Sequence, residues 1–175
     1  MDRSYPAGGL DSANLPIPHC RAPRMDVALL FFLILLNALF AMSEMALTAS
    51  RKARLQVMVE TGDAGARAAL KLHDNPTKFL SVVQVGITSI SVLNGIVGDA
   101  AFSGPFAFWL AQHFAIAQRA AEITATAMVV VTVTFITIIF GELVPKRFGL
   151  MYPEQVARVV ARPMEWLSLI TRPFI

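Results

Sequence analysis

An uncharged apolar run from Ile123 to Phe140 constrains most strongly what this chain can fold into. A stretch of about 18 or more apolar residues without charges is typical of a transmembrane helix. Directly after it the sequence reads Gly141-Glu142-Leu143-Val144-Pro145-Lys146. Glycine loosens a helix and proline cannot continue its hydrogen bonds, so the run predicts a membrane helix that ends in a carboxylate beside freed backbone.

Two interpretations of Glu142 follow from the residue types alone. Irregular backbone is tolerated at membrane depth only where it is buried in protein or lines a cavity, which favours a cation ligand. Alternatively, Glu142 lies among the lipid headgroups and pairs with Lys146, four residues further on. The rest of the chain has to decide between them.

The composition excludes an ordinary soluble domain. Hydrophobic residues make up 55% of the 175 residues and charged residues 15%, whereas soluble domains carry about 25% charged residues. The basic residues lie beside the apolar runs, which favours the bilayer surface as a partner and not nucleic acid. The single Cys20 cannot form a disulfide within the chain. No common catalytic motif or nucleophile–base pair is present, so we do not expect an enzyme.

Two further apolar runs complete the fold class, which is an all-α membrane protein. The three predicted spans cover residues 27–49, 79–98 and 123–140. Amphipathic patterns at 51–74 and 153–175 predict juxtamembrane helices, the first split into two short helices near Gly62 and Gly65. Residues 1–24 predict a flexible leader and residues 25–175 the membrane domain, with Met25 as an alternative start. The pattern is still helical at Ile175, so we expect the gene to encode a cytoplasmic region beyond it.

The spans carry polar residues in a regular pattern. Asn37 and Glu44 are seven residues apart in the first span and share one helix face. In the second span, a polar face is predicted, with Asn94 continuing it; its other members are Ser81, Gln84, Thr88 and Ser91. Such a face serves either as a helix–helix interface joined by hydrogen bonds or as a row of oxygens along an ion path. Both interpretations are compatible.

The basic residues predict the orientation. Six lie between the first and second spans, one between the second and third, five after the third and three in the leader. Because cytoplasmic segments are enriched in Lys and Arg, the N-terminus is predicted outside and the C-terminus in the cytoplasm. Ser43, Glu44 and Glu142 then reach the same depth, at the cytoplasmic ends of two spans.

Three motifs together resemble the transmembrane domain of the CNNM/CorC family, also called DUF21 and, in older usage, hemolysin-like. They are residues 37–46 (NALFAMSEMA), 84–88 (QVGIT) and 140–146 (FGELVPK), in the family's order. The resemblance implies a three-span homodimer linked to magnesium transport, with sodium-coupled export. It also implies a cytoplasmic CBS-domain pair that binds ATP, which is absent from this chain.

The same resemblance implies a magnesium site. Ser43 and Glu142 match two of the family's ligands. The family's asparagine of the second span aligns with Ser91, so this chain departs from the pattern there. Asn94 could replace it, although it points about 60° away on an ideal helix. The predicted magnesium ligands are therefore Ser43, Glu142 and either Ser91 or Asn94, which offer the oxygen atoms that Mg²⁺ prefers.

The predicted function is that of a Mg²⁺ transporter domain of the inner or plasma membrane, exporting Mg²⁺ with Na⁺ as coupling ion. The alternative is a membrane anchor that does not transport and serves as a regulatory scaffold for a cytoplasmic nucleotide-sensing region. Such a scaffold keeps the spans but does not need a bound ion. Direct magnesium flux discriminates between the two.

Overall fold

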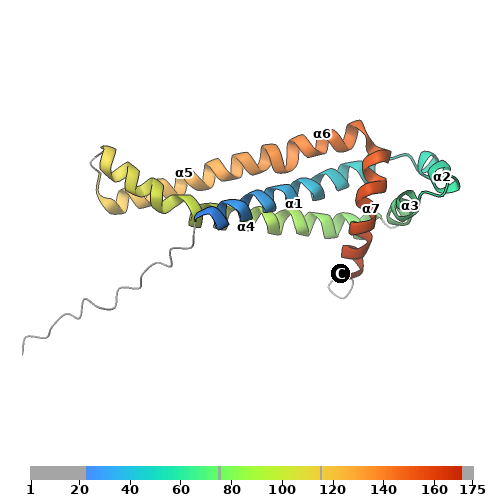
Figure 1. Cartoon of the computed structure of the whole chain (residues 1–175), viewed down its shortest axis with the longest axis horizontal. Helices are drawn as coiled ribbons and strands as arrows, with labels where there is room; N and C mark the ends of the chain where they lie inside the picture. Colours follow the sequence, from blue (N-terminus) through green and yellow to red (C-terminus); the bar gives the residue numbers. More distant parts are fainter. Residues whose placement is uncertain (1–22, 75, 115, 171–175) are drawn as a thin grey trace, which may run out of the picture.

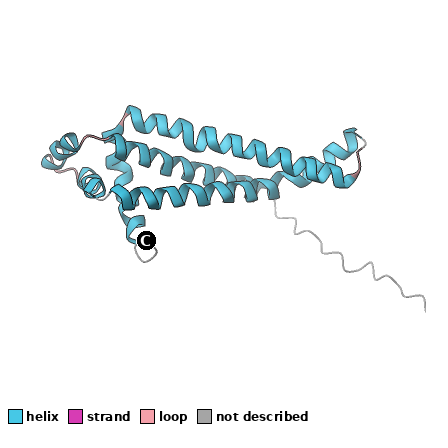
Figure 2. Ribbon diagram, turned by 180° about the vertical axis from the view of Figure 1, so that it is seen from behind, coloured by secondary structure: helices cyan, strands magenta, loops and turns pink. Residues whose placement is uncertain are grey.

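The computed structural model describes residues 23–74, 76–114 and 116–170, and its regular structure there is entirely helical (Figure 2). The elements in chain order are α1 (Pro23–Ala49), α2 (Lys52–Glu60), α3 (Ala64–Asp74), α4 (Pro76–Phe114), α5 (Gln118–Ile138), the π-helical turn η1 (Ile139–Leu143), α6 (Val144–Met151) and α7 (Pro153–Ile170). The predicted all-α fold is confirmed. The predicted leader lies, up to residue 22, outside the described residues.

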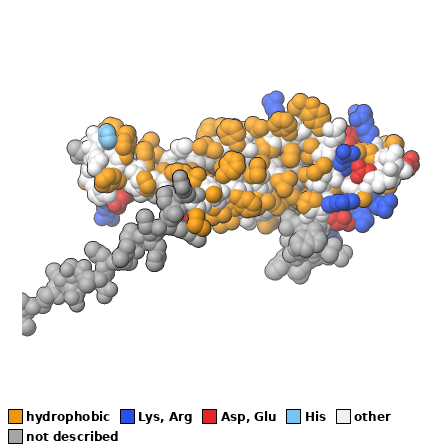
Figure 3. All heavy atoms as spheres, in the orientation of Figure 1, with side chains coloured by type: hydrophobic (Ala, Val, Ile, Leu, Met, Phe, Trp, Pro, Cys, Tyr) orange, Lys and Arg blue, Asp and Glu red, His pale blue; other side chains and the backbone are white. Residues whose placement is uncertain are grey.

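Three helical segments are long and apolar enough to cross a membrane, as predicted. They are Met25–Ala49, Pro76–Phe114 and Gln118–Met151. The segments lie side by side, with α4 antiparallel to both α1 and α5–α6 (Figure 1). Hydrophobic side chains cover the length of this bundle, while most Lys and Arg side chains gather at the end near α2 and α3 (Figure 3). The chain is therefore a multi-pass membrane protein.

Two of these helices continue past the proline and glycine residues that interrupt their sequences. The second begins at Pro76 and runs through Pro105 to Phe114, beyond both predicted ends. The third does not stop at Phe140, because η1 and α6 continue it to Met151. A proline removes one hydrogen bond from a helix, and here the helix continues past it.

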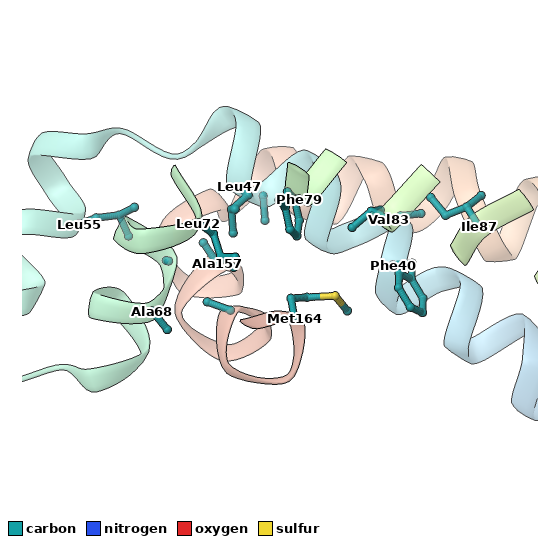
Figure 4. Close-up of a cluster of buried hydrophobic side chains, with 14 of the residues drawn as sticks. Phe40, Leu47, Leu55, Ala68, Leu72, Phe79, Val83, Ile87, Ala157 and Met164 are labelled. Carbon is teal, nitrogen blue, oxygen red and sulfur yellow. The ribbon is translucent and has the colours of Figure 1, made fainter. Parts of the chain in front are cut away.

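The end of the bundle covered by α2, α3 and α7 is called the juxtamembrane end below. A buried cluster joins these short helices to α1 and α4 (Figure 4). Its members include Phe40, Leu47, Leu55, Ala68, Leu72, Phe79, Val83, Ile87, Ala157 and Met164. Apolar burial on this scale is the main force that fixes the short helices against the bundle.

Asp63 fixes the start of α3 and the position of α7 together. Its carboxylate accepts hydrogen bonds from the backbone N–H groups of Gly65 (2.8 Å) and Ala66 (3.1 Å) and pairs with Arg158 at 3.3 Å. These hydrogen bonds, with the nearby guanidinium, hold the pKa of Asp63 below its usual 3.8. Gly62 separates α2 from α3 with a φ of 92°, a left-handed conformation that glycine adopts without strain. The predicted split into two short helices is thus confirmed.

Candidate functional site

The backbone around Pro145 is completed by a side chain from α1. Pro145 has no N–H, so the carbonyl of Gly141, four residues earlier, lacks its usual helical donor. Asn37 supplies one, with Nδ2 donating to the Gly141 carbonyl at 3.2 Å. A Cβ atom at position 141 would lie 3.0 Å from Asn37 Nδ2, so glycine leaves the room that this hydrogen bond needs. The same region takes the wider π-helical pattern, in which Val144 N–H bonds to the Ile139 carbonyl.

A charged cluster, defined as Glu44, Glu142 and Lys146, lies beside this turn. Lys146 Nζ is 2.7 Å from Glu142 Oε1 and 3.5 Å from Glu44 Oε2. The side chains are partly buried, with exposed fractions of 18% for Glu44, 24% for Lys146 and 34% for Glu142. Glu44 Oε2 is enclosed by protein and makes no hydrogen bond. Two carboxylates from different helices therefore share one ammonium group.

The predicted pairing of Glu142 with Lys146 is present, but the pair is not isolated. Sequence reasoning placed Glu44 at the same depth as Glu142 and did not include it in the site. The signal was available, because Glu44 is the only charged residue between Asp26 and Arg51. An ammonium group is a hydrogen-bond donor only, so Lys146 occupies one oxygen of each carboxylate, Glu142 Oε1 and Glu44 Oε2, and offers no ligand atom of its own to a cation.

Ser43, which precedes Glu44 on α1, is fully buried. Its hydroxyl donates to the Phe40 carbonyl within the same helix, at 2.7 Å. The ring of Phe40 packs against Gly86 of α4, whereas Asn37 bonds to Gly141 of η1. The described structure shows no hydrogen bond between Ser43 and Glu142.

The two candidate ligands of the second span lie on different faces of α4. Ser91 is exposed on the outside of the bundle, as are Ser81, Gln84 and Thr88. Asn94 is buried, with 1% of its surface exposed. The expectation that Asn94 continues the polar face was wrong, because thirteen residues correspond to about 220° of rotation from Ser81. The structure brings neither Ser91 nor Asn94 into hydrogen-bond contact with Glu142.

The described residues contain no group of three or more His, Cys, Asp or Glu side chains close enough to hold a metal ion. The carboxylates available at the site are Glu44 and Glu142, and with Lys146 the formal charge of the cluster is −1. An uncompensated charge of this kind inside a membrane bundle attracts a cation. The fold and this cluster define a multi-pass membrane domain with a partly buried charged cluster of formal charge −1.

The sequence comparison agrees with this class. Residues 28–175 match the family described as the cyclin M (CNNM) transmembrane N-terminal domain. The chain belongs to this family, which confirms the resemblance drawn from the three motifs.

Curated relatives match most of this chain. The chain is 36% identical to the UPF0053 protein sll0260 of Synechocystis over 151 residues, which are 86% of this chain and 34% of that protein. It is 37% identical to the polyamine export protein of Salmonella typhimurium, over 86% of this chain and 33% of that protein. It is 31% identical to the UPF0053 protein YugS of Bacillus subtilis, over 86% and 35%. The chain thus spans about a third of the length of these relatives.

The hydrogen bond from Asn37 to Gly141 leads to a first prediction. Asn37→Leu keeps a similar volume but removes the donor, which leaves the Gly141 carbonyl buried without a partner. We expect the variant to unfold at lower temperature in detergent micelles, with a loss of about 1–3 kcal/mol in the free energy of unfolding. Thermal unfolding followed by circular dichroism measures the loss.

Thr134→Val is the matched control, since it also replaces a polar side chain by an apolar one. Thr134 is exposed on α5, so the control should unfold like the wild type. Equal stability of Asn37→Leu and Thr134→Val would show that the hydrogen bond does not support the turn.

Proposed function

We propose that this domain transports a cation across the membrane through the charged cluster, with Mg²⁺ as the substrate. The observation that carries the proposal is the meeting of Glu44 and Glu142, from separate membrane helices, on the single ammonium of Lys146. Ionisable groups inside membrane segments are costly and mark substrate pathways more often than they support a fold. The membership of the CNNM family supports a transport role.

The chemistry of Mg²⁺ suits two carboxylates with neutral oxygens around them. The ion takes about six oxygen ligands and gives up water reluctantly. In the proposal, Glu142 supplies charge, Ser43 supplies a hydroxyl and carbonyl, and Ser91 or Asn94 joins from α4. Since Ser91 and Asn94 do not contact Glu142 in the described conformation, completing the shell requires α4 to move relative to α1 and η1. A sodium gradient is the proposed source of energy for export.

Lys146 acts as an internal counter-ion in this proposal. It neutralises part of the carboxylate charge when no substrate is bound and swings away when Mg²⁺ enters. Its repulsion of the ion keeps the affinity modest, and transport needs an ion that can leave.

A polyamine is the second candidate substrate. Two observations favour it: relatives at 37% and 34% identity are named polyamine export proteins, and the cluster already binds a primary ammonium group. A diamine would replace Lys146 with an ammonium of its own. Flux of Mg²⁺ and of the diamine 1,4-diaminobutane, measured in the same proteoliposomes, decides between the two. Transport of the diamine without transport of Mg²⁺ would overturn the magnesium assignment.

The role of Glu142 leads to a second prediction. Glu142→Gln keeps the size of the side chain and removes its charge. We expect the variant to lose Mg²⁺ flux in proteoliposomes, together with any stabilisation of the fold by Mg²⁺, because a ligand stabilises only the state that binds it. Yield after purification should stay close to that of the wild type.

Lys146→Gln is the control for this experiment. An ammonium offers no lone pair to a cation, so its loss should leave Mg²⁺ binding intact or tighten it. If Glu142 and Lys146 form only a partly exposed ion pair, worth roughly 0–1 kcal/mol, both variants would behave alike and transport would survive. Normal flux through Glu142→Gln would overturn the role of Glu142 as a ligand, whereas a wild type without Mg²⁺ flux would favour the scaffold function.

We also propose that the juxtamembrane end faces the cytoplasm. The exposed basic residues of this end support the proposal, since cytoplasmic segments are rich in Lys and Arg. Examples are Arg51, Arg67, Lys78 and Arg147.

The orientation gives a third prediction. In a chain with Cys20 replaced by serine, a cysteine at Gly104 should react with a membrane-impermeant maleimide added to intact cells. A cysteine at Ala64 should react only after the membrane is opened. Both positions are exposed, so access to the reagent depends on the side of the membrane. The reverse labelling would contradict the proposed orientation.

A homodimer is proposed as the functional unit. Ser81, Gln84, Thr88 and Ser91 form an exposed polar face along α4, and lipid tails satisfy no polar group. A second copy of the chain would cover this face and supply hydrogen-bond partners.

The dimer gives a fourth prediction. Light scattering on the protein in detergent should give twice the mass of one chain, and Thr88→Leu should shift the protein toward monomer. Val131→Leu, a change on the exposed surface of α5, is the control and should leave the mass unchanged. A monomeric wild type would contradict the proposal.

A further inference from the structure

A groove lies between α1, α4 and α5, in the half of the bundle away from the juxtamembrane end. Its volume is about 610 Å³, and it is called the apolar groove below. Among the described side chains that line it, polar atoms come only from the hydroxyl of Thr132 and the indole N–H of Trp109. A buried water molecule needs several polar partners, so this lining favours a hydrocarbon occupant over ordered water.

The second half of α4 forms one wall of the apolar groove. Phe102, Phe106 and Trp109 line it and follow each other at spacings of four and three residues, so they share one helix face. Pro105 lies among them, and a proline inside a helix removes a hydrogen bond and bends the axis. Figure 1 shows the last part of α4, drawn in yellow, inclined to its first part. The bend gives the groove a wall that is not parallel to α1 and α5.

The opposite wall comes from α5 and defines the size of the groove. Met128, Thr132 and Ile136 line it, and the eight residues from the first to the last correspond to about 12 Å of helix. Spread over this length, a volume of 610 Å³ gives a cross-section of roughly 50 Å². A helix with its side chains is about 10–12 Å across, or roughly 80–110 Å². The groove is therefore too narrow for a helix of a second copy and wide enough for hydrocarbon chains.

The position of the apolar groove in the bundle indicates where such chains come from. All three of its helices belong to segments that can cross a membrane, and Phe102, Met128 and Ile136 are exposed on the surface of the bundle. The groove thus opens toward lipid. At its outer end Trp109 stacks on the exposed ring of His113, with ring centroids 4.6 Å apart. Amphipathic aromatic side chains of this kind favour the level of the lipid headgroups.

We propose that the apolar groove is a binding site for the acyl chains of a membrane phospholipid. The chains lie along Met128, Thr132 and Ile136 of α5, and the headgroup lies at the level of Trp109 and His113. The lipid is a bound ligand of the domain, which distinguishes it from the lipids that exchange freely around the bundle.

The bound lipid also has a structural role. The groove ends at Val133, where a Cβ atom on Gly98 of α4 would lie 2.8 Å from the valine side chain. Beyond this tight contact the acyl chains fill the space between α4 and α5 and support the inclined part of α4. The inference does not rest on the proposed function, since lipid binding is measured without any transported substrate.

The test uses the fluorescence of Trp109, because this side chain lines the groove. The chain contains two tryptophans, so Trp166→Phe leaves Trp109 as the single reporter. The purified full chain is kept in digitonin, whose rigid steroid tail does not resemble an acyl chain. It is titrated with phosphatidylcholine that carries a dibrominated acyl chain, since bromine quenches a tryptophan that it contacts. We expect quenching that saturates and that unbrominated phosphatidylcholine reverses.

Thr132→Phe, made in the same background, fills the groove from an exposed position of α5. We expect half-saturation to need roughly tenfold more lipid. Val131→Phe adds a ring at the neighbouring position, which is exposed and outside the lining, and should bind lipid like the parent. Thr132→Leu is a smaller addition that keeps the test decisive if Thr132→Phe does not fold, and it should weaken binding in the same direction.

Two outcomes would overturn the proposal. Quenching that rises in proportion to the lipid without saturating would mean that only freely exchanging lipid touches Trp109. Equal titration curves for Thr132→Phe, Thr132→Leu and Val131→Phe would mean that lipid binds elsewhere. Light scattering on the same samples identifies the other possible occupant: loss of dimer in Thr132→Phe without any saturable quenching in the parent would assign the groove to a second copy of the chain.

Discussion

The hydrogen bond from Asn37 to the Gly141 carbonyl is the interaction on which the site depends. A proline at position 145 removes the usual helical donor for that carbonyl, and Gly141 is buried in the bundle, where an unpartnered carbonyl is costly. The side-chain amide of Asn37, on α1, supplies the missing donor. This hydrogen bond fixes the register of α1 against η1. With this register fixed, Glu44 of α1 comes within reach of Lys146 of α6.

The electrostatics of the charged cluster follow from the same register. Two carboxylates share one ammonium, so the cluster keeps a formal charge of −1. Its side chains are partly buried, and charges that are partly removed from water interact more strongly than charges on a fully exposed surface. The π-helical turn η1 contributes as well. Its wider hydrogen-bond pattern changes the directions in which Glu142, within the turn, and Lys146, after it, point. Turns of this kind are frequent at functional sites.

Much of the fold could be predicted because apolar length and helical periodicity are local properties of the sequence. The three spans, the split at Gly62 and the depth shared by Glu44 and Glu142 all came from such patterns. The helix ends were predicted less accurately. Pro105 and Pro145 act as helix breakers only where no neighbour compensates for the lost hydrogen bond. Asn94 was placed on the wrong face of the second span, which the helical rotation from Ser81 alone shows. Its burial became visible only in the packed bundle.

The sequence by itself determined that this chain is a three-span helical membrane domain, because charge-free apolar runs of this length are typical of membrane helices. The resemblance of its three motifs indicated the CNNM family, to which the chain belongs. It offered the pairing of Glu142 with Lys146 as one of two alternatives, since residues four apart share a helix face, and the structure contains this pair. Only the tertiary structure decided that Glu44 joins that pair and that Asn37 completes the backbone at Gly141. Those contacts join residues far apart in the chain, and their meeting depends on the rotation and register of packed helices, which no local pattern encodes.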